Sequence, residues 1–301
     1  MGDWSTARNV LCVRLDTMGD VLMTTPALRA VKQSARGRRV TLLTSSASAE
    51  VARLVPEVGR VIVYDAPWMK RESASAGAEV GLALIEQLRR ERFDAAVIFT
   101  VYSQSPLPAA LACYLADIPL RLAHCRENPY QLLTDHVPER EPGEFARHEV
   151  ERQLDLVSAV GWRTRDTRLS LRIPVESCDR VLGMLAHAGV DPADPWIILH
   201  PGATAASRRY PAEGFADAAR RLSAEDGRRV IITGGAAEMG LAEGLCASIG
   251  PAAISVAGQL QLGELAALIE LAPLLLSNNT GPVHIAAAVG TPVVDLYALT
   301  N

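Results

Sequence analysis

The sequence lacks an excess of basic charge. Its 301 residues include 30 Lys and Arg against 34 Asp and Glu, which gives a formal net charge of −4 at pH 7. Lysine itself is scarce, since Lys32 and Lys70 are the only two. A protein that wraps nucleic acid must neutralise many phosphates, so this charge balance argues against that class and allows at most a local basic patch.

Three further features are missing. The five cysteines are odd in number and have no CxxC spacing, which argues against a disulfide framework or a zinc site. The first residues, MGDWSTARN, carry charges and no apolar core, so we expect no secretory signal. The most apolar windows, 265–276 and 283–299, are too short or too interrupted to span a membrane. These absences predict a cytoplasmic protein that meets a membrane only peripherally, from its surface.

Apolar, β-branched runs alternate with helical patterns from the N-terminus onward. NVLCVRL is followed by a helical pattern through PALRAVKQSA, and RRVTLLTS, RVIVYD and DAAVIFT are further strand-like runs. This order predicts a parallel sheet whose strands are joined by helices. The stretch 121–144 is rich in Pro, Arg and Glu and is expected to be irregular, and 169–173 is expected to be a short strand.

The same alternation restarts after the polar stretch GVDPADP at 189–195. We place the domain boundary there, which gives one domain over 1–188 and a second over 189–301. With 49% hydrophobic residues the chain can bury two cores of this size. The predicted fold is α/β, with two Rossmann-like βαβ domains whose ligand sites face one another across a cleft.

The strongest local motif is SNNTGPVHIAAAVG, where a buried strand turns into a helix. Asn279, Thr280 and Gly281 form the turn, so the positive end of the helix lies at the carboxyl edge of the strand and suits a diphosphate. Gly281 allows close approach of an anion, and Thr280 can cap the helix or bind phosphate. A well-capped structural helix explains the motif equally well, and His284 one turn later is more often packed than catalytic.

Two other strand-to-helix loops carry polar residues. In HPGATAASRRYP, Gly202 lies in a turn, and the Arg208 and Arg209 guanidinium groups are candidates to bind phosphate oxygens, although such a pair is often only a solvated surface. In RVIITGGAAEMG, Gly235 follows a strand, and Glu238 is placed to accept hydrogen bonds from a ribose diol or to serve as an ordinary helix-start charge.

The N-terminal loop RLDTMGDVL places carboxylates after the first strand. Asp20 is positioned to take a proton from an attacking sugar hydroxyl, and Asp16 is a competing candidate. The loop has no GxGxxG motif, which counts against a nicotinamide-dependent dehydrogenase.

These four segments together resemble glycosyltransferase family 9, the ADP-heptose:lipopolysaccharide heptosyltransferases, over nearly the whole chain. MGDVLMTTPALRAVK, HPGA with RRYP, and NTGPVHIAAAVGTPVVDLY match the signatures of that family. The resemblance implies a GT-B fold and a metal-independent, inverting transfer of heptose from ADP-heptose to a lipopolysaccharide acceptor, with no cofactor besides the donor. It also implies that relatives continue past the final YALTN through further helices.

Residue by residue, the resemblance implies that Asp20 is the general base and that Arg208, usually Lys in the family, contacts the donor diphosphate. Around this diphosphate it places Thr280, Gly281 and His284, and it assigns the ribose contact to Glu238. Asn279 stands where the family usually has an Asp that touches the transferred sugar. The alternatives are therefore a transferase for another nucleotide sugar or a small-molecule acceptor, an epimerase of the same architecture, and a protein that binds a nucleotide sugar without turnover.

The resemblance also assigns acceptor binding to the domain over 1–188 and donor binding to the domain over 189–301. In the first of these, four arginines of the stretch 121–147 are candidates for binding an anionic glycolipid acceptor. They are Arg121, Arg126, Arg140 and Arg147.

Overall fold

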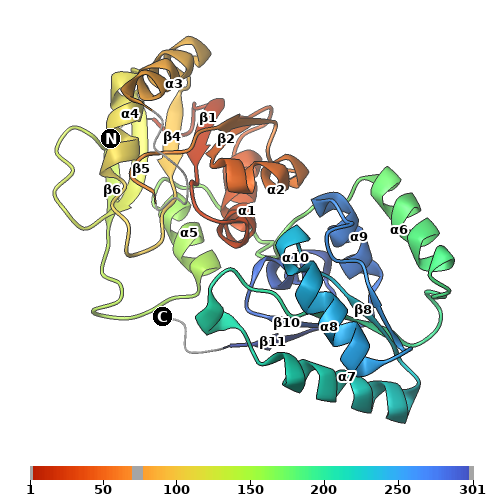
Figure 1. Cartoon of the computed structure of the whole chain (residues 1–301). Coiled ribbons are helices and arrows are strands. Elements are labelled where there is room, and N and C mark those ends of the chain that lie inside the picture. Colours follow the sequence, from red (N-terminus) through yellow and green to blue (C-terminus); the bar gives the residue numbers. More distant parts are fainter. Residues whose placement is uncertain (1–2, 70–76, 298–301) are drawn as a thin grey trace. The chain divides into compact units, whose positions relative to one another are not determined.

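The computed structural model describes residues 3–69 and 77–297. Contacts within the chain divide it into two compact units, Met1–Ser170 and Leu171–Asn301, each with its own parallel sheet (Figure 1).

The first unit is a six-stranded sheet in the order β3-β2-β1-β4-β5-β6, with every neighbouring pair parallel. Its strands are β1 (Asn9–Val13), β2 (Arg39–Thr44), β3 (Arg60–Val63), β4 (Ala95–Ile98), β5 (Leu120–Cys125) and β6 (Asp135–Pro138). Its helices are α1 (Met18–Gln33), α2 (Ala49–Leu54), α3 (Ala78–Glu91), α4 (Leu107–Leu115) and α5 (Glu149–Ser158). The strand order reverses between β1 and β4, which is where ligands bind in doubly wound sheets.

The second unit is a five-stranded parallel sheet in the order β11-β10-β7-β8-β9. Its strands are β7 (Trp196–His200), β8 (Arg229–Ile232), β9 (Ala253–Ser255), β10 (Leu275–Asn278) and β11 (Val293–Leu296). Its helices are α6 (Val175–His187), α7 (Ala212–Asp226), α8 (Met239–Ile249), α9 (Leu262–Leu271) and α10 (Gly281–Val289). Here the order reverses between β7 and β10.

Burial explains why the central strands are apolar throughout. Every residue of β4 and of β7 is buried, because helices joining parallel strands cover both faces of each sheet. These strands carry no polar face that would mark them as half-exposed. The predicted α/β class with two Rossmann-like units is therefore confirmed.

The division between the units lies earlier than the sequence suggested. The structure separates them at Ser170 and Leu171 instead of at 188 and 189. The reason is α6, which packs against α9 and buries Val181 and Leu185. The polar stretch 189–195 is thus a loop inside the second unit.

Two local predictions are wrong. The stretch 121–144 contains β5 and β6, and no strand forms over 169–173. The sequence hid β5 because Arg121 lies within it, yet this side chain is buried and donates to the backbone carbonyls of Leu132 and Gln131 at 2.7 and 2.8 Å. Among the described residues, no helix has both the length and the apolarity needed to cross a membrane.

Candidate functional site

Each unit carries a group of candidate residues at the point where its strand order reverses. In the first unit Asp16 and Asp20 follow β1, and in the second unit the candidates follow β7, β8 and β10.

In the first unit, Arg14 organises three carboxylates. Its side chain is fully buried, and its nitrogens lie 3.0 Å from oxygens of Asp16, Asp20 and Glu149. These carboxylates come from the loop after β1, from the first turn of α1 and from the first turn of α5. A buried guanidinium is stable only when it is paired in this way, so Arg14 fixes the positions of all three.

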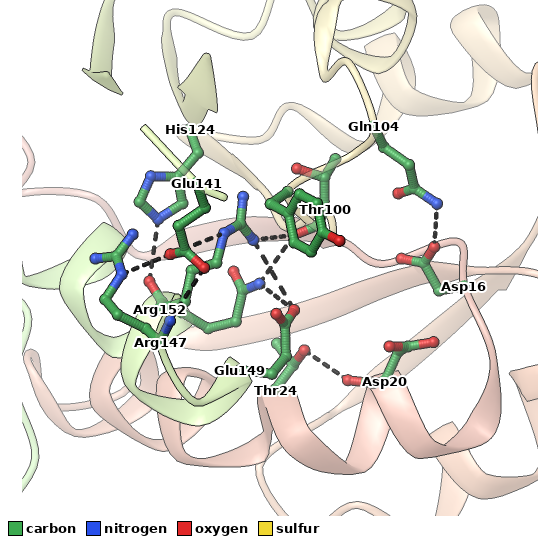
Figure 2. A network of polar contacts seen from close by, with 12 residues as sticks. Asp16, Asp20, Thr24, Thr100, Gln104, His124, Glu141, Arg147, Glu149 and Arg152 are labelled. Carbon is green, nitrogen blue, oxygen red and sulfur yellow. Dashed lines mark hydrogen bonds and ion pairs between the residues drawn. The ribbon is translucent and has the colours of Figure 1, made fainter. Parts of the chain in front are cut away.

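The carboxylates of Asp16 and Asp20 have different surroundings. Asp20 accepts from the Thr17 backbone N–H at 3.0 Å and from the Thr17 hydroxyl at 2.6 Å, which caps α1. Asp16 accepts from Nε2 of Gln104 at 2.5 Å (Figure 2). Burial raises the pKa of Asp16, and the Asp20 carboxylate adds to this rise while Arg14 opposes it. Of the two carboxylates that the sequence offered, Asp16 is the less solvated, with 7% of its side chain exposed against 17% for Asp20.

A wider network of buried charges continues from Glu149 (Figure 2). Arg152, which is 1% exposed, donates to Glu139 and to the carbonyl of Thr100, and Arg147 donates to Glu141 at 2.6 Å. Gln153 donates to Glu149 at 2.6 Å. These contacts tie α5 and the segment before it to the carboxyl end of β4.

A cavity of about 280 Å³ opens beside Asp16. Its walls come mainly from the segments that follow β1 and β4, and Trp68 closes one side. The other lining residues are Val13, Leu15, Met69, Ile98, Phe99, Thr100, Ser103, Gln104, Ser105, Pro106, Pro108 and Ala109. Asp20 does not line it.

The arginines expected to bind an anionic acceptor are largely engaged within the protein. For Arg121 the expectation is wrong, because the side chain is buried among backbone carbonyls. Arg147 pairs with Glu141 and Asp155, and Arg126 donates to the carbonyls of Tyr102 and Glu141.

Arg140 is the one of the four whose described ion pair is exposed. It lies 3.4 Å from Glu144, and both side chains are more than half exposed. It remains accessible to a ligand, but as one charge it does not make a basic patch.

In the second unit, the buried side chain of Asn278 joins two loops. Its Nδ2 donates to the carbonyl of Pro201 at 2.7 Å, and its Oδ1 accepts from the N–H of Tyr210 at 3.0 Å. The loop that contains Arg208 is therefore fixed at the end of β10, next to the turn at Asn279 and Thr280. Arg208 itself is exposed.

The turn after β10 opens α10 as the motif predicted. Thr280 is the extended N-cap residue, and its side chain makes no capping hydrogen bond, so its hydroxyl is not used to start the helix. Gly281 is the first helical residue, and His284 lies half-buried one turn along. The Asn279 amide donates to Asp295 on β11 at 2.9 Å.

Glu238 and two glycines form a compact group after β8. The N–H of Gly235 donates to Oε2 of Glu238 at 2.8 Å, as part of a helix cap. A Cβ added at Gly202 would lie only 1.8 Å from Oε1 of Glu238, so Gly202 supplies the space that this carboxylate occupies.

A second cavity, of about 170 Å³, lies beside this group. It is lined by His200, Thr233, Gly234, Gly235, Leu260, Gln261, Leu262 and Leu265. Burial lowers the pKa of His200 to about 4, and the Glu238 carboxylate opposes this shift. His200 is therefore neutral near pH 7, with Nδ1 at 2.9 Å from the Thr233 hydroxyl.

Sequence reasoning missed the residues that hold the candidates in place. Asn278, Arg14 and Gln104 lie in or next to motifs, but their roles depend on partners up to 135 residues away. In the second unit Asn278 fixes the loop that contains Arg208 at the end of β10, just before Thr280 and Gly281. The structure also brings Gly202, Gly235 and Glu238 together. Within residues 3–69 and 77–297, no three His, Cys, Asp or Glu side chains are grouped as metal ligands.

Comparison with known proteins identifies the family to which this sequence is similar. The model of glycosyltransferase family 9 (heptosyltransferase) matches residues 81–301. The chain is similar to the lipopolysaccharide heptosyltransferase 3 of Escherichia coli, with 24% identity over 94% of this chain and 81% of that protein.

Two solved structures have the same fold. A glycosyl transferase family 9 protein from Veillonella parvula superposes with a TM-score of 0.83 and 20% identity, covering 100% of this chain and 83% of that one. The E. coli ADP-heptose lps heptosyltransferase II gives a TM-score of 0.75 and 23% identity, over 96% and 84% of the two chains. The family model covers most of the chain, and the two parallel sheets are those of the related structures. This chain therefore belongs to glycosyltransferase family 9 and is a glycosyltransferase of the GT-B fold.

Proposed function

We propose that this chain transfers a heptose from ADP-heptose to a saccharide acceptor of the lipopolysaccharide core, with inversion and without a metal ion. The observation that carries the donor half is the Asn278 side chain, which holds the Arg208 loop beside the start of α10. The names of the related proteins support the sugar and the acceptor class. The reaction takes place in the cytoplasm, where the enzyme contacts the membrane peripherally.

The donor diphosphate binds between Arg208 and the N-terminal turn of α10 in this proposal. A helix start attracts anions through its partial positive charge, and the Thr280 hydroxyl is not occupied by capping. Arg208 supplies a full charge that offsets the negative charge developing on the leaving diphosphate.

The nucleoside binds in the 170 Å³ cavity, where glycine backbone and leucine side chains offer a mostly apolar lining. Glu238 lies at its edge and accepts the ribose hydroxyls. Because Oε2 already accepts from Gly235, Oε1 is the oxygen that remains for this contact.

The transfer itself is a single displacement. An acceptor hydroxyl attacks the anomeric carbon of the heptose, and ADP leaves from the opposite face. The proton goes to a carboxylate at the end of β1, where the family resemblance names Asp20 and where Asp16 also lies.

A second candidate is a transferase of the same class that uses another nucleotide sugar. The observation that favours it is Asn279, whose amide donates to Asp295. At this position the family usually has a carboxylate, so the contacts to the transferred sugar differ here.

Titration calorimetry with ADP, UDP and GDP, followed by turnover assays, tests the proposal. We expect selective binding of ADP, and transfer from ADP-heptose that persists in EDTA. Binding of UDP or GDP in place of ADP would favour the second candidate, and loss of activity in EDTA would overturn the metal-independent mechanism. Binding of ADP without hydrolysis or transfer would indicate a nucleotide-sugar-binding protein instead.

A further inference from the structure

We propose that Glu149 is a positioning residue for the transfer step, because it shares one nitrogen of Arg14 with the carboxylate of Asp20. Through this shared contact, Glu149 controls how strongly Asp20 attracts the proton of the acceptor hydroxyl. The inference rests on the proposed glycosyl transfer with Asp20 as its general base. It adds a role for α5, whose first turn carries Glu149.

The two oxygens of Asp20 accept different numbers of hydrogen bonds. Oδ2 accepts two from Thr17, one from the backbone N–H at 3.0 Å and one from the hydroxyl at 2.6 Å. Oδ1 accepts one from the described residues, donated by Nη2 of Arg14 at 3.0 Å. Each carboxylate oxygen can accept two hydrogen bonds, so Oδ1 is the oxygen that can still receive a proton. A group that acts on Arg14 therefore acts on the reacting oxygen.

The same nitrogen of Arg14 donates to Glu149. Nη2 lies 3.0 Å from Oε1 of Glu149 and 3.0 Å from Oδ1 of Asp20, so its two N–H bonds are divided between the two carboxylates. The side chain of Arg14 is fully buried, and both carboxylates are mostly buried. Because little water separates these three groups, the charge of Glu149 is weakly screened where it acts on Asp20.

Glu149 is itself held in place by α5 and β4 (Figure 2). Its Oε1 accepts from Nε2 of Gln153 at 2.6 Å, and this amide also donates to the carbonyl of Thr100 at 3.0 Å, just after β4. Gln153 is fully buried. The start of α5 also favours a negative charge in its first turn. A carboxylate fixed in this way keeps the guanidinium of Arg14 at a defined distance from Asp20.

The charges around Asp20 explain why this contact matters for proton transfer. Arg14 is one cation among three carboxylates, because it also lies 3.0 Å from Asp16. Glu149 offsets part of the positive charge of Arg14, which would otherwise favour ionised Asp20 and weaken it as a base. On its other side, Glu149 lies 3.9 Å from Arg152. The titratable groups around Arg152 are His124, Glu139, Glu141 and Arg147.

The step balances with the groups already named. The proton of the acceptor hydroxyl passes to Oδ1 of Asp20, while the acceptor oxygen forms a bond to the anomeric carbon of the nucleotide sugar. The bond from that carbon to the phosphate oxygen breaks, and its electron pair leaves with the nucleoside diphosphate. Glu149 acts on this step through Arg14 and exchanges no proton itself.

The pH dependence of kcat/KM tests this role. Glu149→Gln keeps the size of the side chain and an acceptor oxygen but removes the charge. We expect the acidic limb of the profile with ADP-heptose to move to lower pH by about 0.5–1 pH unit, because one negative charge beside the base is lost. The plateau should fall about threefold, because a weaker base is less effective, and the Kd of ADP should not change.

The first turn of α5 supplies a matched control. Glu151→Gln removes an exposed carboxylate from that same turn, so it changes the charge at the start of the helix equally without touching Arg14. This variant should leave the acidic limb in place. An unmoved limb in Glu149→Gln, or an equal movement in Glu151→Gln, would overturn the inference.

A second variant separates charge from position. Glu149→Asp keeps the charge but shortens the side chain by one methylene, so Arg14 loses its fixed contact. We expect kcat to fall while the acidic limb stays near its wild-type pH. A purely structural role for Glu149 predicts instead that both variants lose activity and that neither moves the limb.

Carboxyl ¹³C NMR gives the same comparison without turnover, with the signal of Asp20 assigned through Asp20→Asn. The titration midpoint of Asp20 should lie at lower pH in Glu149→Gln than in wild type, and identical midpoints would overturn the coupling. Asp20→Asn should lower kcat about 10²-fold or more, and full activity would overturn the inference by removing its base. If the wild-type chain turns over no nucleotide sugar, the proposed function fails, and the NMR titration still decides whether Glu149 acts on Asp20.

Discussion

The strand order of each sheet reverses at one point, and the candidate sites at these two points differ in how their charged groups are paired. In the first unit, the guanidinium groups of Arg14 and Arg152 are buried and already paired with carboxylates. In the second, Arg208 is exposed and the helix start at Thr280 has no side-chain cap. The guanidinium groups of the first site are thus already engaged by carboxylates of the protein, whereas the second site leaves its positive groups for an anionic ligand to neutralise.

The difference shows what each site offers to a ligand. The first site offers fixed carboxylate acceptors, because Arg14 and Arg152 are already paired with carboxylates. A diphosphate brings two negative charges of its own, so its site needs donors that are free in the absence of ligand.

Breaking a buried pair in the first unit should have the largest effect on stability. Arg152→Gln leaves the carboxylate of Glu139 buried without its partner, and we expect the free energy of unfolding to fall by about 3–5 kcal/mol. Urea denaturation measures this change in the free energy of unfolding. The matched change Arg90→Gln removes an exposed pair with Glu86 and should cost less than about 1 kcal/mol. Equal losses would mean that burial does not distinguish the two pairs.

In the second unit, the corresponding change should affect catalysis and leave stability alone. Arg208→Ala should lower kcat with ADP-heptose about 10²- to 10³-fold, because it removes the charge that offsets the leaving diphosphate. Arg208→Lys should recover much of this rate. Arg221→Ala on the exposed face of α7 is the control. A normal rate in Arg208→Ala would remove this residue from the donor site.

Each unit also contains a buried neutral histidine, and both should make stability depend on pH. Burial lowers the pKa of His124 and of His200 to about 4. An unfolded chain binds these protons near pH 6.5, so acid favours unfolding between pH 6.5 and 4, and stability rises with pH across that window. Each histidine contributes up to about 3 kcal/mol to this change. Unfolding of His200→Gln, measured from pH 4 to 7, should have a shallower slope than wild type, and an unchanged slope would contradict the shift.

The smallest effect should come from the glycine that makes room for Glu238. Gly202→Ala places a methyl group where the carboxylate lies. Because this carboxylate is the far end of a flexible, half-buried side chain, it can move aside, so we expect a loss of only about 0.5–1.5 kcal/mol in stability, from its hydrogen bond to Gly235, together with weaker binding of ADP. Gly240→Ala on α8 is the matched control, because its Cβ meets nothing within 4 Å and should stabilise by about 0.4–1 kcal/mol. Thermal unfolding and calorimetry compare them, and unaltered ADP binding in Gly202→Ala would separate Glu238 from the donor.

The sequence predicted the parts of the fold that depend on local pattern. The alternation of apolar runs and helical patterns identified most of the strands, and NTGPVH identified the turn that opens α10. It failed at β5, because a buried arginine bonded to backbone carbonyls is indistinguishable in sequence from an exposed one. It failed at α6, because whether a helix belongs to one unit or the other depends on what it packs against.

The same distinction between local pattern and distant contacts applies to the residues of the candidate site. Positions such as Asp20, Arg208 and Thr280 follow strands directly, so a motif is enough to single them out. The side chains that position them, Asn278 and Arg14, act on groups far away in the sequence, and no local spacing records those contacts. Their roles follow only from coordinates.

The strand orders described above also bear on how the chain is made. In each sheet the first strand of the unit, β1 or β7, is central, and the next two strands extend the sheet on one side before the later ones extend it on the other. When each new strand of a nascent chain leaves the ribosome, the sheet already formed therefore has an exposed edge strand with which the new strand can pair. Parallel sheets fold slowly because their contacts join distant segments of the chain. In this strand order, an unpaired strand edge waits for its partner only while one crossover connection is being synthesised.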